Sequence, residues 1–149
     1  MSRERLRLLE LSMAFSVLLI ALDAQAQTIE ETFQEFHLLG TWSANCNVPP
    51  IRFDAWVAYV ASPDGTVTRR TILDEKGTSY SHRVLSARRV ASDRLALTYE
   101  YGKNTGYILM EFRDDRHRTL EARFGDTVNI EGGIMKATGK ETVWLLRCR

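Results

Sequence analysis

The sequence predicts an all-β protein, a small up-and-down antiparallel barrel of about eight strands preceded by one short helix. Three observations predict this class. After Gly40 the chain consists of short apolar segments separated by turns at roughly regular spacing. Only one segment, near residue 30, has helical periodicity. The turns are short, which favours a meander. A β-sandwich is the alternative, but closure into a barrel removes the exposed edges of such a sheet.

The first 26 residues are expected to be a signal peptide. Three arginines precede residue 8, residues 13–22 are apolar except for Ser16, and Ala24-Gln25-Ala26 has the small-x-small cleavage pattern. The apolar run is too short to cross a hydrocarbon core of ~30 Å as a helix. We therefore expect one barrel domain over residues 27–149, in the periplasm or secreted. A retained anchor and a start at Met13 are the alternatives.

Net charge excludes some partner classes. The chain carries 20 Lys and Arg against 19 Asp and Glu, a formal charge of +1. That balance does not favour nucleic acid or an anionic membrane surface as a partner.

The helix is predicted between Gln27 and Gly40. Thr28 and Glu31 have the spacing of a capping box. Apolar residues recur at intervals that place them on one helical face, and Gly40 provides a stop signal. The face that should dock on the barrel consists of Ile29, Phe33 and Phe36.

Eight or nine strands are predicted after the helix. Turn signals include Pro49-Pro50 and the segments SPDG, DEKG, GKNTG and DDRH. The segment 128–139 is expected to pass through a Gly-Gly kink as one strand. The predicted strand segments are 40–46, 54–61, 66–73, 78–90, 94–101, 107–113, 119–125, 128–139 and 142–149.

The two cysteines predict a disulfide, Cys46–Cys148. Disulfides persist outside the cytoplasm, and two cysteines allow a single intramolecular pairing. Free thiols and an intermolecular bond are the alternatives. Closing a loop of about 100 residues contributes ~4–5 kcal/mol in the chain-entropy model.

Strand alternation gives the expected position of this bond. It places Trp42, Ala44 and Cys46 on one face of the first strand, and Trp144, Leu146 and Cys148 on one face of the last. If both faces point inward, the bond lies in or beside the core and joins the first strand to the last.

Gly40-Thr41-Trp42 after a short helix resembles the opening of lipocalins and their calycin relatives. The resemblance implies that an Arg near the end of the barrel packs over the Trp, here Arg147 or Arg149. The segment GTW…C near the start of the domain, together with the W…RC ending, also resembles a group of small secreted proteins of Gram-negative bacteria. A bacterial protease inhibitor fold shares the small barrel, the early G-x-W and a disulfide, so the resemblance does not select a function. The structural signature comprises Gly40, Trp42, Trp144 and Arg147.

The sequence shows no catalytic or cofactor motif. We place His37 at the helix end, His82 in a strand and His117 in a turn, and none has metal-ligand spacing. Ser81 and His82 point to opposite faces of a strand and cannot form a dyad. We expect no catalytic residues, no metal and no cofactor.

The aromatic residues are the candidate ligand-lining set, although they are equally suited to fill a small barrel. The first functional hypothesis is a non-catalytic binding barrel for a small apolar ligand. The alternative is an inhibitor or interaction module that binds a protein such as a protease or cell-wall hydrolase, through the 47–53 loop and the pairs Arg69-Arg70 and Arg88-Arg89. The candidate lining residues are Trp56, Tyr59, Tyr99, Tyr101, Phe112 and Phe124.

Overall fold

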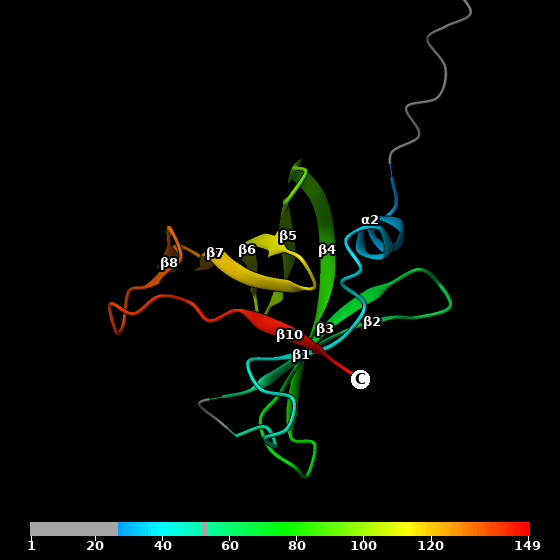
Figure 1. Cartoon of the computed structure of the whole chain (residues 1–149). Helices are drawn as coiled ribbons and strands as arrows, with labels where there is room; N and C mark the ends of the chain where they lie inside the picture. The colour runs from blue at the N-terminus through cyan, green and yellow to red at the C-terminus, as the bar shows by residue number, and fades with distance from the viewer. Residues whose placement is uncertain (1–26, 52–53) are drawn as a thin grey trace, which may run out of the picture.

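The structure, a computed structural model, describes residues 27–51 and 54–149 (Figure 1). The expected signal peptide lies outside the described residues. Within these residues, one helix and ten strands follow in chain order: α2 (Ile29–Glu35), β1 (Gly40–Ser43), β2 (Trp56–Ala61), β3 (Val67–Ile72), β4 (Ser79–Ala91), β5 (Arg94–Tyr101), β6 (Asn104–Arg113), β7 (Arg116–Phe124), β8 (Thr127–Glu131), β9 (Ile134–Met135) and β10 (Leu145–Cys148).

Eight strands close into the predicted antiparallel barrel. Strands β1 to β7 pair in sequence order, and β10 pairs with both β1 and β7. In Figure 1 the red strand β10 lies next to β1, while β8 stands away from the barrel. This closure confirms the barrel prediction over the sandwich, since every barrel strand has a neighbour on both edges for part of its length.

The outer edge of β7 is shared by two partners. Its first residues pair with β10, and its last residues, Ala122 to Phe124, pair with β8. The single strand predicted over 128–139 is wrong, because Gly132 and Gly133 both take positive φ, 58° and 79°. Two consecutive positive φ angles form a hairpin turn. The segment therefore becomes the β8–β9 hairpin, outside the barrel.

The predicted capping box begins α2. The Thr28 hydroxyl accepts a hydrogen bond from the Glu31 backbone N–H at 3.2 Å, and the Glu31 carboxylate accepts one from the Thr28 N–H at 2.8 Å. The helix ends at Glu35, earlier than the Gly40 stop predicted. His37 takes a left-handed φ of 51°, and the Leu38 N–H donates to the Phe33 carbonyl at 2.9 Å. This Schellman motif ends the helix.

The helix docks on the barrel at the end of β4. Phe33 and Leu38 are completely buried, and Phe36 is 8% exposed. Arg89 of β4 forms an ion pair with Glu35 and lies over the Phe36 ring, 5.0 Å from its centroid. The predicted apolar face of the helix is therefore the face that closes one end of the barrel.

Strand alternation fills the barrel with large side chains. Residues directly opposite each other in an antiparallel pair share a face. The resulting core is continuous from the helix to the far end. Its buried members are Phe33, Phe36, Leu38, Trp42, Val57, Tyr59, Val67, Val84, Leu95, Leu97, Tyr99, Ile108, Met110 and Ala122.

The expected inward position of Cys148 is wrong. Trp42, which is buried, lies opposite Arg147, whereas Cys148 lies opposite Thr41. Cys148 and Leu146 therefore face outward, and it is Leu145 that packs against the core. A phase difference of one residue moves every side chain of a strand to the other face.

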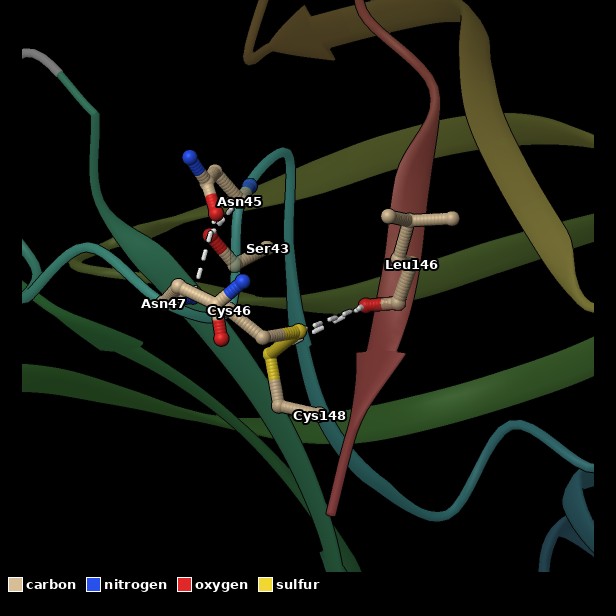
Figure 2. The surroundings of a disulfide bond; sticks show 6 residues. All are labelled: Ser43, Asn45, Cys46, Asn47, Leu146 and Cys148. Carbon is tan, nitrogen blue, oxygen red and sulfur yellow. Dashed lines mark hydrogen bonds between the residues drawn. A yellow bond between two sulfur atoms is a disulfide. The ribbon is translucent and has the colours of Figure 1, made fainter.

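The disulfide is present, and it joins the outside of the seam (Figure 2). Cys46 lies in a turn beyond β1, where the Ser43 hydroxyl accepts from the Asn45 N–H and the Asn45 side chain accepts from the Asn47 N–H. The Cα atoms of Cys46 and Cys148 are 5.3 Å apart. Both sulfurs lie 3.9–4.0 Å from the Leu146 carbonyl oxygen. A disulfide has no proton to donate, so these are packing contacts.

In the part of the chain that the structure describes, no helix is long and apolar enough to cross a membrane.

Replacing Cys46 and Cys148 together with serine should lower the melting temperature in oxidising buffer. The bond closes a separation of 102 residues, and losing that constraint on the unfolded chain costs ~4–5 kcal/mol in the chain-entropy model. Thermal unfolding with and without reductant measures this. The variant and the parent should melt alike under reductant; equal melting in oxidising buffer would contradict a stabilising bond.

Substituting Gly106→Ala should destabilise the barrel by about 1–3 kcal/mol through overpacking. Gly106 lies opposite Tyr99, and a Cβ there would stand 2.3 Å from the Tyr99 ring. Urea unfolding checks the loss. In a Tyr99→Leu background the same glycine substitution should cost clearly less, and an unchanged cost would show that the ring is not the cause.

Candidate binding cleft at the helix end of the barrel

A cleft of about 790 Å³ opens at the helix end of the barrel. It lies between the end of α2, the β6–β7 turn and β10. Its volume is within the range of sites that hold small organic molecules. The lining residues are Phe36, His37, Trp42, Cys46, Phe112, Asp114, Asp115, Arg116, Leu146, Arg147, Cys148 and Arg149.

Three aromatic rings, with Leu146, form the apolar part of this lining. Phe36 comes from the end of α2, Trp42 from β1 and Phe112 from β6. The Phe36 and Phe112 ring centroids are 4.8 Å apart. The Trp42 indole N–H donates to the Leu38 carbonyl at 2.8 Å, so its polar group is already satisfied. Phe36 and Trp42 are 8% and 3% exposed, so the half-buried Phe112 offers the larger share of the aromatic surface in the cleft.

The rim of the cleft is charged with both signs. Asp114 and Asp115 form the turn between β6 and β7, and Arg116 follows them. Arg147 and Arg149 come from the last residues of the chain. Acidic and basic groups thus surround an aromatic floor, an arrangement suited to a ligand with an apolar body and a polar end.

Arg147 reaches its place on the rim because residue 40 is glycine. Gly40 has φ 124°, and a Cβ there would lie 3.2 Å from the Arg147 Nε. The residue opposite Trp42 in the strand register is Arg147. Of the two arginines suggested by the resemblance, Arg147 is therefore the one paired with the Trp.

His117 lies beneath the aromatic floor and is 2% exposed. Its ring centroid is 4.6 Å from that of Trp42 and 5.7 Å from that of Phe112. Within residues 27–51 and 54–149, neither ring nitrogen has a hydrogen-bond partner. Burial, helped by the charge of Arg69, lowers the pKa of His117 to about 3, so the imidazole is neutral at pH 7.

Some of the predicted signature and site residues lie at the cleft, and others lie elsewhere. Gly40, Trp42, Arg147 and Phe112 meet at the cleft, and the disulfide forms part of its wall. Trp144 lies apart from them, immediately before β10. Its ring is within cation–π distance of three guanidinium groups. These belong to Arg113, Arg116 and Arg118, at 5.2, 5.8 and 4.9 Å.

The other predicted lining residues do not reach this cleft. Alternation with the buried Val57 and Tyr59 places Trp56 on the outer face of β2. Tyr59 and Tyr99 are buried in the barrel interior, as the core-filling alternative has it. Tyr101 and Phe124 stack with centroids 4.8 Å apart at the end of the barrel away from α2.

The sequence did not predict the position of His117 beneath the cleft or that of Phe36 in its lining. His117 was assigned to a turn, but the turn holds only Asp114 and Asp115, and His117 points into the barrel opposite Leu145. A bulge in β7 shifts the pairing near Leu120, so alternation counted back from Phe124 gives the wrong phase at His117. Phe36 carried a usable signal, its place on the apolar helix face.

The alternative binding loop, residues 47–53, includes Arg52 and Phe53, which lie outside the described residues. Its use in binding a protein stays a prediction. Comparison of this chain with protein families, curated proteins and solved structures finds no match.

Stability should fall as the pH drops from 6.5 toward 5 because His117 is buried neutral. Its pKa in the folded state, about 3, is below the ordinary 6.5. The unfolded chain therefore binds a proton that the folded chain does not, and each pH unit costs about 1.4 kcal/mol. Burial also lowers the pKa of His82, in the same direction.

Urea unfolding at a series of pH values measures this slope. The His117→Leu variant should show a shallower slope over the same window. His37→Asn is the matched control, since Asn tolerates the left-handed φ of residue 37, and it should keep the parent slope. If His117→Leu keeps the parent slope too, His117 is not the acid-sensitive group.

Proposed function

We propose that this protein is a non-catalytic binding barrel that takes a small ligand with an apolar body. The observation that carries the proposal is the aromatic floor of Phe36, Trp42 and Phe112 in a cleft of about 790 Å³. An apolar group placed on this floor leaves water and gains about 25 cal/mol for each Å² buried. The rim arginines and carboxylates then meet the polar end of the ligand.

The packing of the barrel favours the cleft over the interior as the place for this ligand. Tyr99, Leu97 and Met110 are each 1% exposed and occupy the centre. A deep apolar cavity of the lipocalin kind would need several of these side chains to be small. The cleft instead uses the outer rim of the barrel and the end of the helix.

The walls of the cleft are held in place before a ligand arrives. The disulfide fixes the end of β10, and the Schellman motif fixes the backbone around His37. Trp42 is held by its hydrogen bond to Leu38. Preorganised walls lose little conformational freedom on binding, and more of the contact energy remains as affinity.

The non-catalytic part of the proposal is supported by the position of His117. It is the side chain near the cleft with the strongly lowered pKa, yet the Trp42 and Phe112 rings lie against it and it is 2% exposed. A general base must come within hydrogen-bond reach of its substrate. A ligand in the cleft meets the aromatic rings first.

The proposal places the protein in the periplasm or outside the cell. Its support is the leader pattern of residues 1–26 together with the Cys46–Cys148 bond. Such bonds persist in oxidising compartments and are rare in the cytosol.

Binding of 1-anilinonaphthalene-8-sulfonate, an aromatic probe with one sulfonate, tests the cleft. The parent should bind it, and Leu146→Trp should weaken binding about tenfold, or 1.4 kcal/mol, because the larger ring fills the cleft. Leu146 is 42% exposed, so the new side chain does not strain the core. Titration with direct excitation of the probe gives both affinities.

Leu85→Trp is the matched control. The side chain of Leu85 is 41% exposed, nearly the same fraction as that of Leu146, but Leu85 does not line the cleft. This variant should bind the probe as the parent does, with all three proteins shown to be folded by near-ultraviolet circular dichroism. Equal binding by both variants, or no binding by the folded parent, would overturn the proposal.

A further inference from the structure

Arg69 points into the barrel. It lies directly opposite Tyr59 of β2 and His82 of β4 in the sheet. Opposite residues share a face, and Tyr59 is 3% exposed in the core. The neighbouring Arg70 therefore faces outward, where it donates to the Ser79 hydroxyl at 2.8 Å and to the Gly77 carbonyl at 3.3 Å.

The guanidinium of Arg69 is poorly satisfied where it lies. None of the ion pairs formed among residues 27–51 and 54–149 includes Arg69. One of its nitrogens donates to the Thr71 hydroxyl at 2.9 Å, while its Nε is buried without a hydrogen-bond partner among those residues. Arg69 as a whole is half-buried, and its Nε–H is the donor that is shielded from water without a partner.

An unpaired cation in this position is unfavourable for stability. Removing a charge from water costs several kcal/mol unless a partner charge or a set of hydrogen bonds offsets it. Leaving the strand position apolar would avoid the cost. The arrangement becomes favourable when an anion takes the unused donors, since charge-assisted hydrogen bonds are about twice as strong as neutral ones.

The surroundings favour a single negative charge. His82 and His117 are the other basic groups near Arg69, and burial followed by the Arg69 charge lowers the pKa of both. Burial raises the pKa of the Tyr59 and Tyr99 hydroxyls, with Arg69 opposing it, so these stay protonated. Arg69 is thus the one formal charge in the group, and it balances a monoanion.

The neighbouring rings suit the organic part of such an anion. The Arg69 guanidinium lies 5.5 Å from the Tyr99 ring centroid. His82 packs against Tyr99 and Tyr101, both at 5.6 Å, and Tyr101 stacks on Phe124. Tyr101 is 42% exposed, so this aromatic group reaches the surface at the end of the barrel away from α2.

We propose that Arg69 anchors a second binding site, at the end of the barrel opposite α2, for a small molecule that carries one carboxylate. The planar guanidinium matches a carboxylate in a two-point contact. The Thr71 hydroxyl lies beside it, and the rings of Tyr101 and His82, which are not fully buried, take the apolar part of the ligand. This site is separate from the cleft and does not depend on the function proposed for it.

Sodium benzoate is the probe, with benzamide as its neutral counterpart and sodium chloride and sodium sulfate as inorganic anions at matched ionic strength. Millimolar benzoate should raise the melting temperature of the parent, and benzamide should not. The Arg69 Nε–H resonance should shift on adding benzoate. This resonance is assigned to Arg69 because it is absent from the spectrum of the Arg69→Met variant.

Arg69→Met should abolish the stabilisation by benzoate, while Arg70→Met, the matched control on the outer face of the same strand, should retain it. Arg69→Met is expected to fold, because replacing an unpaired interior charge with an apolar side chain is neutral or stabilising. If it does not fold, Arg69→Lys replaces it. The lysine keeps the charge but loses the planar fork, and should bind benzoate about tenfold more weakly.

The Leu146→Trp variant separates the two sites. It fills the cleft, and its response to benzoate should match that of the parent. Three results would overturn the proposal: an equal benzoate effect in Arg69→Met and in the parent, an equal effect of benzamide, or a shift of the Nε–H resonance by chloride or sulfate as large as that by benzoate.

Discussion

The pairing of β10 with both β1 and β7 is the constraint on which the rest of the structure depends. It places Arg147 opposite Trp42 and Leu145 opposite His117, so one four-residue strand pairs with buried residues on both sides of the seam, and its Leu145 packs against the core. The outer face of the same strand carries Leu146 and Cys148 to the wall of the cleft. Without β10, the barrel would keep two open edges and the cleft would lose one side.

The elements of the fold were readable from the sequence because they depend on local signals. The Thr28–Glu31 capping box and the turn residues each act over a few positions. The predictions that failed depend on which face of a strand a residue occupies. The face that Cys148 shares with Leu146 proved to be the outer one, because pairing with β1 sets the phase of β10. His117 was assigned to a turn that in the structure ends at Asp115. Such positions are set by pairing with a distant strand.

The candidate sites show the same limit. An aromatic side chain suits a core and a binding surface equally well, and only its position along the strand separates the two. The rings of Tyr59 and Phe112 lie 6.5 and 5.7 Å from that of His117, yet Tyr59 is packed inside the barrel and Phe112 lines the cleft. Arg69 shares a strand face with Val67 and Thr71, which would have indicated that it faces inward. Because Arg70 is also an arginine, the sequence alone did not show which of the two faces the interior. Charge on an inner face is visible only when the register is known.

The seam has unequal sides. Three residues of β1 pair with β10, and the disulfide adds a covalent link on that side, whereas only two residues of β7 pair with β10. The β7–β10 boundary is therefore the weaker side, where we expect local opening of the barrel to begin while β10 stays attached to β1. Backbone amides along that boundary exchange with solvent before those of β1. Because the Cys46–Cys148 bond keeps β10 beside β1, the part of the cleft wall that β10 carries stays next to Trp42 even when the β7 edge separates.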